Sequence, residues 1–256
     1  MNESIAVPSL MQAVGTYRRM HWTRLSRGRL RYALAILLAL PVATAAVALG
    51  FDRAPFDYVL ELYFRFLVPF LPALGASAIV SEEIESRTFT FIFARPAPRV
   101  AMVLGKFVAF TGPLLVGFTI SLAATYAVAS LRGGGDDFVA GLGPFARALG
   151  VSLVGVIVFS AITSLVGSWF TRSPFMGAVG YVLLIEWIFS FVPFFKLLTV
   201  TWHLRNLAAF NAGKVLLGSD WQVPLWGSAL ALVAFGGLSM LGAAAAVSGA
   251  EYRTDR

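Results

Sequence analysis

Six long apolar runs, separated by polar or charged stretches, dominate the chain. An apolar helix of ~20 residues is long enough to cross the hydrocarbon core of a bilayer. Glycine and proline inside such runs are compatible with a membrane helix, because neighbouring helices satisfy the freed backbone groups. The pattern predicts an all-α polytopic membrane protein with six transmembrane helices and both termini on one side. The expected spans are residues 30–50, 62–80, 100–131, 144–170, 174–195 and 224–249.

Residues 1–28, which precede the first apolar run, predict an amphipathic helix. Arginines occupy much of one side of this helix, and such a helix suits the surface of an anionic leaflet. A solvated basic tail is the alternative. The apolar or aromatic face would consist of Leu10, Val14, Tyr17, His21 and Leu25.

The N-terminal region also has superficial features of a cleaved signal peptide, namely a basic stretch, an apolar run and "ATA" at 43–45. However, the basic stretch is longer than that of a signal peptide, and the apolar run continues past "ATA" to Leu49. We therefore expect a retained first span.

Two further segments are too polar to span. Residues 196–223 are amphipathic and aromatic, and predict an external loop with one or two short helices. Residues 81–99, "SEEIESRTFTFIFARPAPR", are more aromatic and charged than a loop that only reverses the chain direction. Ser81 followed by three glutamates predicts a short helix. Either this segment inserts into a cleft on another protein, or its phenylalanines lie on the membrane surface.

Composition supports the membrane assignment. Hydrophobic residues make up 58% of the chain and charged residues only 13%, where a soluble domain carries about 25%. The net charge of +7 comes from arginines and lysines concentrated before the first span and around residues 81–99. By the positive-inside rule this places both termini and residues 81–99 in the cytoplasm, and we expect no nucleic-acid partner.

The sequence offers no catalytic chemistry. There is no cysteine, and the two histidines lie far apart. The Gly-Lys pairs at 105–106 and 213–214 lack the following Ser or Thr and the preceding glycine of a nucleotide-binding loop. We therefore expect neither enzyme activity nor a cofactor or metal in this chain, and any work must draw on a partner.

Three of the charged residues within or beside the expected spans are candidate site residues: Glu61, Arg65 and Glu186. A carboxylate at the depth of Glu186 should face the protein interior and find a partner or take a proton. Glu61 and Arg65 are four residues apart and can pair, or Arg65 can reach Glu186. Ion pairing within this trio would lock helices together.

The stretch "VSEEIESRTFTFIFARPAPRVAMVLGKF" resembles the cytoplasmic signature of ABC-2 type permeases, the membrane subunits of ABC exporters. One departure is Arg87, where the family often has glycine before the threonine. The six-span layout, the basic entry helix and the long last external loop resemble the family over nearly the whole chain. The matching positions are Glu82, Glu83, Glu85, Thr88, Arg95, Pro96, Arg99, Gly105 and Lys106.

The resemblance implies a half-transporter in the bacterial inner membrane. In this family the second and fifth spans lie near the central pathway, so the resemblance also implies that Glu61, Arg65 and Glu186 line that pathway instead of only locking helices together. Two permease chains would pair as a homodimer, and each would dock a separate ATPase subunit that binds ATP and Mg²⁺. A non-transporting scaffold within a larger assembly of envelope proteins is the alternative, and the substrate is not readable. The residues expected to couple to the ATPase are Glu82, Glu83, Glu85, Arg87, Thr88, Arg95 and Arg99.

Overall fold

The computed structural model describes residues 9–28, 30–50, 55–79, 99–131, 134–192, 194–208 and 223–249. The described residues that form regular structure are helical, as the sequence predicts. Five helices are long and apolar enough to cross a membrane. They run from Leu30, Val100, Phe138, Pro174 and Leu225 to Ala48, Ser130, Trp169, Phe191 and Ser248, respectively.

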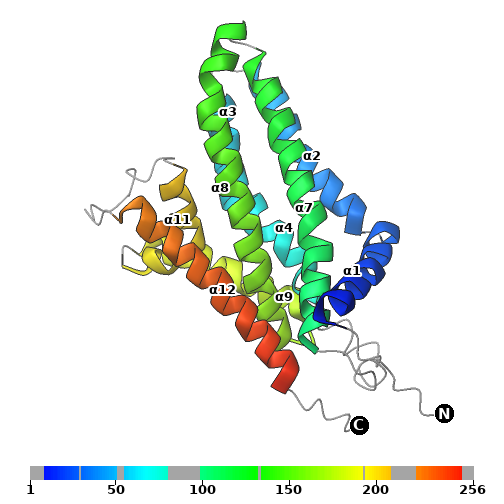
Figure 1. Cartoon of the computed structure of the whole chain (residues 1–256). Coiled ribbons are helices and arrows are strands. Elements are labelled where there is room, and N and C mark those ends of the chain that lie inside the picture. Colours follow the sequence, from blue (N-terminus) through cyan, green and yellow to red (C-terminus); the bar gives the residue numbers. More distant parts are fainter. Residues whose placement is uncertain are drawn as a thin grey trace, which may run out of the picture.

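Helix α1 (Leu10–Arg27) begins where Ser9 forms a capping box with Gln12. Helix α1 is not only a surface helix, because one side of it packs across the start of α7 (Arg99–Ser130). Of the face expected from sequence, His21 is buried, whereas Leu10 is exposed. Figure 1 shows α1 beside the lower ends of α2 (Leu30–Ala48) and α7.

The region expected as the second span consists of three consecutive shorter segments. These are α3 (Pro55–Leu62), the π-helical η1 (Tyr63–Leu67) and α4 (Val68–Gly75). The described residues of the expected second span are therefore not among the five helices that are long and apolar enough to cross a membrane. The Tyr63 hydroxyl bonds to Ser121 in α7, 2.6 Å away, and Tyr63, Phe64 and Leu67 of this π-helical turn are buried in the core.

The expected fourth span starts ten residues too late. Helix α8 (Gly134–Trp169) begins before Pro144, and this proline lies inside the helix instead of starting it. At about 1.5 Å per residue, α7 and α8 are about 48 and about 54 Å long, which exceeds the ~30 Å hydrocarbon core. In Figure 1 their upper ends project beyond the other helices.

The expected fifth span is also segmented and ends earlier than residue 195. It comprises α9 (Pro174–Tyr181), the π-helical η2 (Val182–Ile188) and α10 (Phe189–Phe191). Val192 is extended (φ −96°, ψ 118°), as is favoured for a residue before proline, here Pro193. The last span, α12 (Leu225–Gly249), lies close to its expected limits and packs along α8.

Two short helices follow the fifth span, within the segment for which one or two were expected. They are the 3₁₀ turn η3 (Phe195–Leu198) and α11 (Val200–Leu207). Helix α11 packs against both α8 and α12 (Figure 1).

The core joins α3, η1, α4, α7 and α8. Its largest fully buried side chains include Tyr63, Phe64, Phe110, Phe118 and Phe159. Gly167 permits the contact of α8 with the chain after α4, because a Cβ there would stand 1.9 Å from the Ser77 carbonyl oxygen.

Candidate functional site

Four charged side chains and one tyrosine hydroxyl gather at the two ends of α11. We call Glu61, Arg65, Tyr181, Glu186 and Arg205 the α11 cluster. Its members come from α3 and η1, from α9 and η2, and from α11, so two continuous stretches of the chain converge on one short helix.

Glu186 is buried, with 2% of its surface exposed, and its carboxylate caps the first turn of α11. It accepts hydrogen bonds from the backbone N–H groups of Val200 (3.0 Å) and Thr201 (2.9 Å). The Tyr181 hydroxyl donates a third bond, also 3.0 Å long. Backbone N–H groups at a helix start are otherwise unsatisfied and carry partial positive charge, so a carboxylate is favourable there.

Glu61 binds the other end of α11. Its Oε1 accepts a hydrogen bond from Arg205 Nη2 at 2.7 Å and pairs with Arg65 Nη2 at 3.1 Å. The Arg205 side chain is 22% exposed and that of Arg65 is 54% exposed, so the bond to Arg205 is better shielded from water. The ion pair between Glu61 and Arg65 matches the spacing argument from sequence.

Arg65 does not reach Glu186. Among the described ion pairs, Arg65 meets Glu61 alone, while Glu186 is satisfied by Tyr181 and by the start of α11. The three residues singled out from sequence are thus connected through α11 and not directly. Arg205 was missed as a partner because it lies 144 residues from Glu61 in the sequence.

The two π-helical segments meet beside this cluster. Trp187 in η2 donates its indole N–H to the backbone carbonyl of Arg65 in η1, at 3.3 Å. Its ring packs edge-on against Phe66 with centroids 5.0 Å apart. Single π-helical turns inside α-helices frequently occur at functional sites, and here they carry Arg65 and Glu186.

A third contact fixes α11 to α12. His203 Nε2 donates to the Leu197 carbonyl (2.9 Å), and its Nδ1 accepts from the Ser228 hydroxyl (3.1 Å). Asn206 donates to the same hydroxyl oxygen at 2.8 Å. Burial lowers the pKa of the His203 imidazole, although the bond to Leu197 opposes this, so the neutral ring that the network requires is favoured at pH 7.

The second candidate region is the α1–α7 junction, formed by Tyr17, Ile79, Gly105 and Lys106. A Cβ on Gly105 would stand 2.6 Å from the Tyr17 Cβ and 2.8 Å from the Val14 carbonyl oxygen. Only glycine therefore allows α1 to cross α7 at this distance.

Lys106 is 1% exposed, and its ammonium donates to the Ile79 carbonyl at 2.8 Å. This bond joins the chain just after α4 to the second turn of α7. Ile79 and Arg99 border the undescribed residues 80–98.

Most of the residues expected to couple to an ATPase lie outside the described residues. Arg99 begins α7, but its side chain is also outside them. Among the described residues, no group of three or more His, Cys, Asp or Glu side chains could hold a metal ion. The expected coupling residues that lie outside the described part of the chain are Glu82, Glu83, Glu85, Arg87, Thr88 and Arg95.

Residues 4–208 match a family model described as ABC-2 family transporter protein. This match covers most of the chain, including α1, both π-helical segments and α11. The chain matches no curated protein.

Proposed function

The chain belongs to the ABC-2 family of transporter proteins, and on that premise we propose that it couples ATP hydrolysis by a separate subunit to export of a substrate. As a family member it is the membrane component of an ABC transporter, without ATPase activity of its own. In the proposed assembly two copies pair, each with an ATPase subunit that binds ATP and Mg²⁺. The assembly lies in a bacterial inner membrane, with six spans and both termini in the cytoplasm.

The observation that carries the coupling proposal is the α1–α7 junction. Lys106 links the end of the second span to α7, and Gly105 brings α1 into contact with the same turn. Residues 80–98 connect the end of the second span to α7 in sequence. A force applied to this segment by an ATPase subunit would act on α1, the second span and α7 together.

In this proposal Glu82, Glu83 and Glu85 contact the ATPase, while Arg95 and Arg99 bind lipid phosphates or acidic groups of that subunit. Arg87 and Thr88 lie between them in the sequence and belong to the same coupling segment. Electrostatic contacts of this kind fix the orientation of partners and the rate at which they associate.

The test reverses charge at the proposed contact. The double variant Glu82→Lys/Glu83→Lys, co-expressed with the ATPase subunit and reconstituted, should lose ATPase association or membrane-subunit-dependent ATP hydrolysis. The matched control is Asp136→Lys/Asp137→Lys, an equal charge change near the start of α8, which should retain both. Unchanged association and hydrolysis in the first variant would contradict the proposed contact.

For the α11 cluster, the geometry supports a structural role over a pathway lining. The Glu186 carboxylate is enclosed and directed at backbone donors, and Glu61 holds α11 through Arg205. We therefore assign Glu61, Arg65 and Glu186 to positioning α11 on the outer side of the spans.

A further inference from the structure

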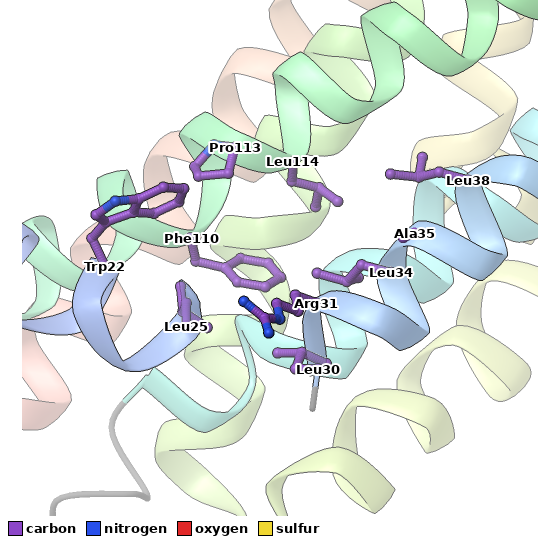
Figure 2. A pocket seen from close by; sticks show the side chains of 10 residues that line it. All are labelled: Trp22, Leu25, Leu30, Arg31, Leu34, Ala35, Leu38, Phe110, Pro113 and Leu114. Atoms are coloured by element: carbon purple, nitrogen blue, oxygen red, sulfur yellow. The ribbon is translucent and has the colours of Figure 1, made fainter. Parts of the chain in front are cut away.

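A hollow of about 230 Å³ lies where α1, α2 and α7 meet (Figure 2). Nine of its ten lining residues are apolar or aromatic, and the tenth is Arg31. The full lining consists of Trp22, Leu25, Leu30, Arg31, Leu34, Ala35, Leu38, Phe110, Pro113 and Leu114.

The hollow opens along a helix that faces lipid. Only 11% of the apolar window of α2 is buried, and Ile36, next to the lining residue Ala35, is 70% exposed. The inner wall is formed by Phe110 and Leu114, which are both buried. An apolar recess of this kind favours hydrocarbon over water.

The volume limits the occupant. Pockets that enclose drug-sized ligands measure roughly 300–1,000 Å³. The hollow is smaller than that and continuous with a lipid-facing surface, so it suits part of one acyl chain.

The single charge indicates which lipid binds. Figure 2 shows the Arg31 side chain among Leu25, Leu30 and Phe110, at the end of the hollow nearest α1. Its guanidinium donates to the Tyr32 hydroxyl at 2.6 Å and lies 4.6 Å from the Tyr32 ring centre. Tyr32 is 58% and Trp22 48% exposed, and aromatic residues of this type concentrate at the level of lipid headgroups.

Arg31 is the second residue of the candidate span Leu30–Ala48, and the end of a span is where lipid headgroups lie. The exposed Arg18 and Arg19 of α1 add positive charge to the same end of the molecule. Positive side chains near a membrane surface attract anionic lipids.

We propose that the hollow binds one acyl chain of an anionic glycerophospholipid, with the lipid phosphate at Arg31. This lipid is a bound component of the permease and not its transported substrate. It contacts α1, α2 and α7 at once, so it stabilises the position of α1 against the spans.

The test uses the full-length protein in nanodiscs that contain a phosphatidylglycerol probe with a photoreactive group in its acyl chain. Mass spectrometry of the labelled peptides reports where the chain lies. Wild-type protein should be labelled within residues 30–38 and 110–114, and a phosphatidylcholine probe should label the same peptides less.

Two variants test separately the charge of Arg31 and the volume of the hollow. Arg31→Gln should lower phosphatidylglycerol labelling about fivefold, and the control Arg172→Gln, an exposed arginine in another loop, should not. Ala35→Trp should fill the hollow and lower labelling by both probes. Ala35 is exposed, so this larger side chain need not disturb the core.

Several results would overturn the proposal. Equal loss in Arg31→Gln and Arg172→Gln would reduce the effect to general surface charge, and unchanged labelling in Ala35→Trp would place the lipid elsewhere. Suppression of labelling by inorganic phosphate would assign Arg31 to a soluble anion. If the peptides that line the hollow are protected from the lipid probe in the wild-type dimer, a second copy of the chain covers the hollow. Each outcome is independent of whether Glu82 and Glu83 bind an ATPase.

Discussion

Glu186 accepts three hydrogen bonds, and two of them come from backbone groups that have no other partner within α11. At the scale of single residues, this makes the carboxylate a fixed support for the start of that helix. Glu186 lies only five residues before α10 ends at Phe191, so the cap is formed near the end of this helical segment and not at its middle.

The substitution Glu186→Gln should lower the stability of the protein. An amide keeps one acceptor oxygen but places an NH₂ group against a backbone donor, which should cost roughly 1–3 kcal/mol. The matched variant Tyr181→Phe removes one of the three bonds and should cost less, about 1 kcal/mol. Thermal unfolding of both purified variants measures which of them loses more stability.

If Glu186→Gln unfolds at the wild-type temperature but alters transport, the carboxylate belongs to the transport pathway. The structural assignment would then be wrong.

Arg205 should contribute more to stability than Arg65, although both bind the same carboxylate oxygen. The bond from Arg205 is shorter and less exposed, and it connects α11 to α3. Arg205→Gln should cost about 1.5–3 kcal/mol, and Arg65→Gln about 1 kcal/mol or less, as for exposed pairs. Double-mutant cycles with Glu61→Gln measure each coupling, and equal coupling energies would contradict the assignment.

At this scale, local spacing allowed some predictions and not others. The Glu61–Arg65 pair follows from four-residue spacing, and the burial of Glu186 follows from its apolar surroundings. The pairing with Arg205 does not follow, because it depends on how α11 folds back over the second span. Its signal in the sequence was limited to an amphipathic stretch after the fifth span.

At the scale of helices, the most restrictive contact is the crossing of α1 and α7 at Gly105. Gly105→Ala introduces a Cβ that would stand 2.6 Å from the Tyr17 Cβ, so α1 must shift. Overpacking of this kind costs about 1–3 kcal/mol. We expect reduced thermal stability and weaker coupling to ATP hydrolysis.

The matched control is Gly112→Ala on the same helix, where a Cβ would meet no atom within 4 Å. It should be neutral or stabilising by up to about 1 kcal/mol, because alanine favours helix. A Gly105→Ala variant that behaves like Gly112→Ala in both assays would contradict the role given to the junction.

Helix limits were predictable where hydrophobicity alone decides them. The ends of α2 and α12 fall close to the expected limits for that reason. The start of α8 was missed because Pro144 is accommodated inside the helix. The π-helical turns of the second and fifth spans depend on tertiary contacts such as Trp187 with Arg65, which no periodicity records.

At the scale of the whole molecule, the described elements separate two tasks. One end carries α1, the Lys106 bond and the residues that border 80–98, and in the proposed mechanism the ATPase subunit acts there. Helix α11 follows the fifth span and is held in place by Glu186, Glu61 and Ser228. The six apolar runs predicted a membrane protein, while only the fold shows that α1 is packed on a span.

The central claim is that this membrane component works with a separate ATPase subunit. The most direct measurement is purification of the tagged full-length protein from its native membranes in mild detergent, followed by quantitative mass spectrometry. The account predicts a nucleotide-binding subunit in an amount roughly equal to that of this chain. Recovery of another envelope assembly without any ATPase would contradict it and would favour a scaffold.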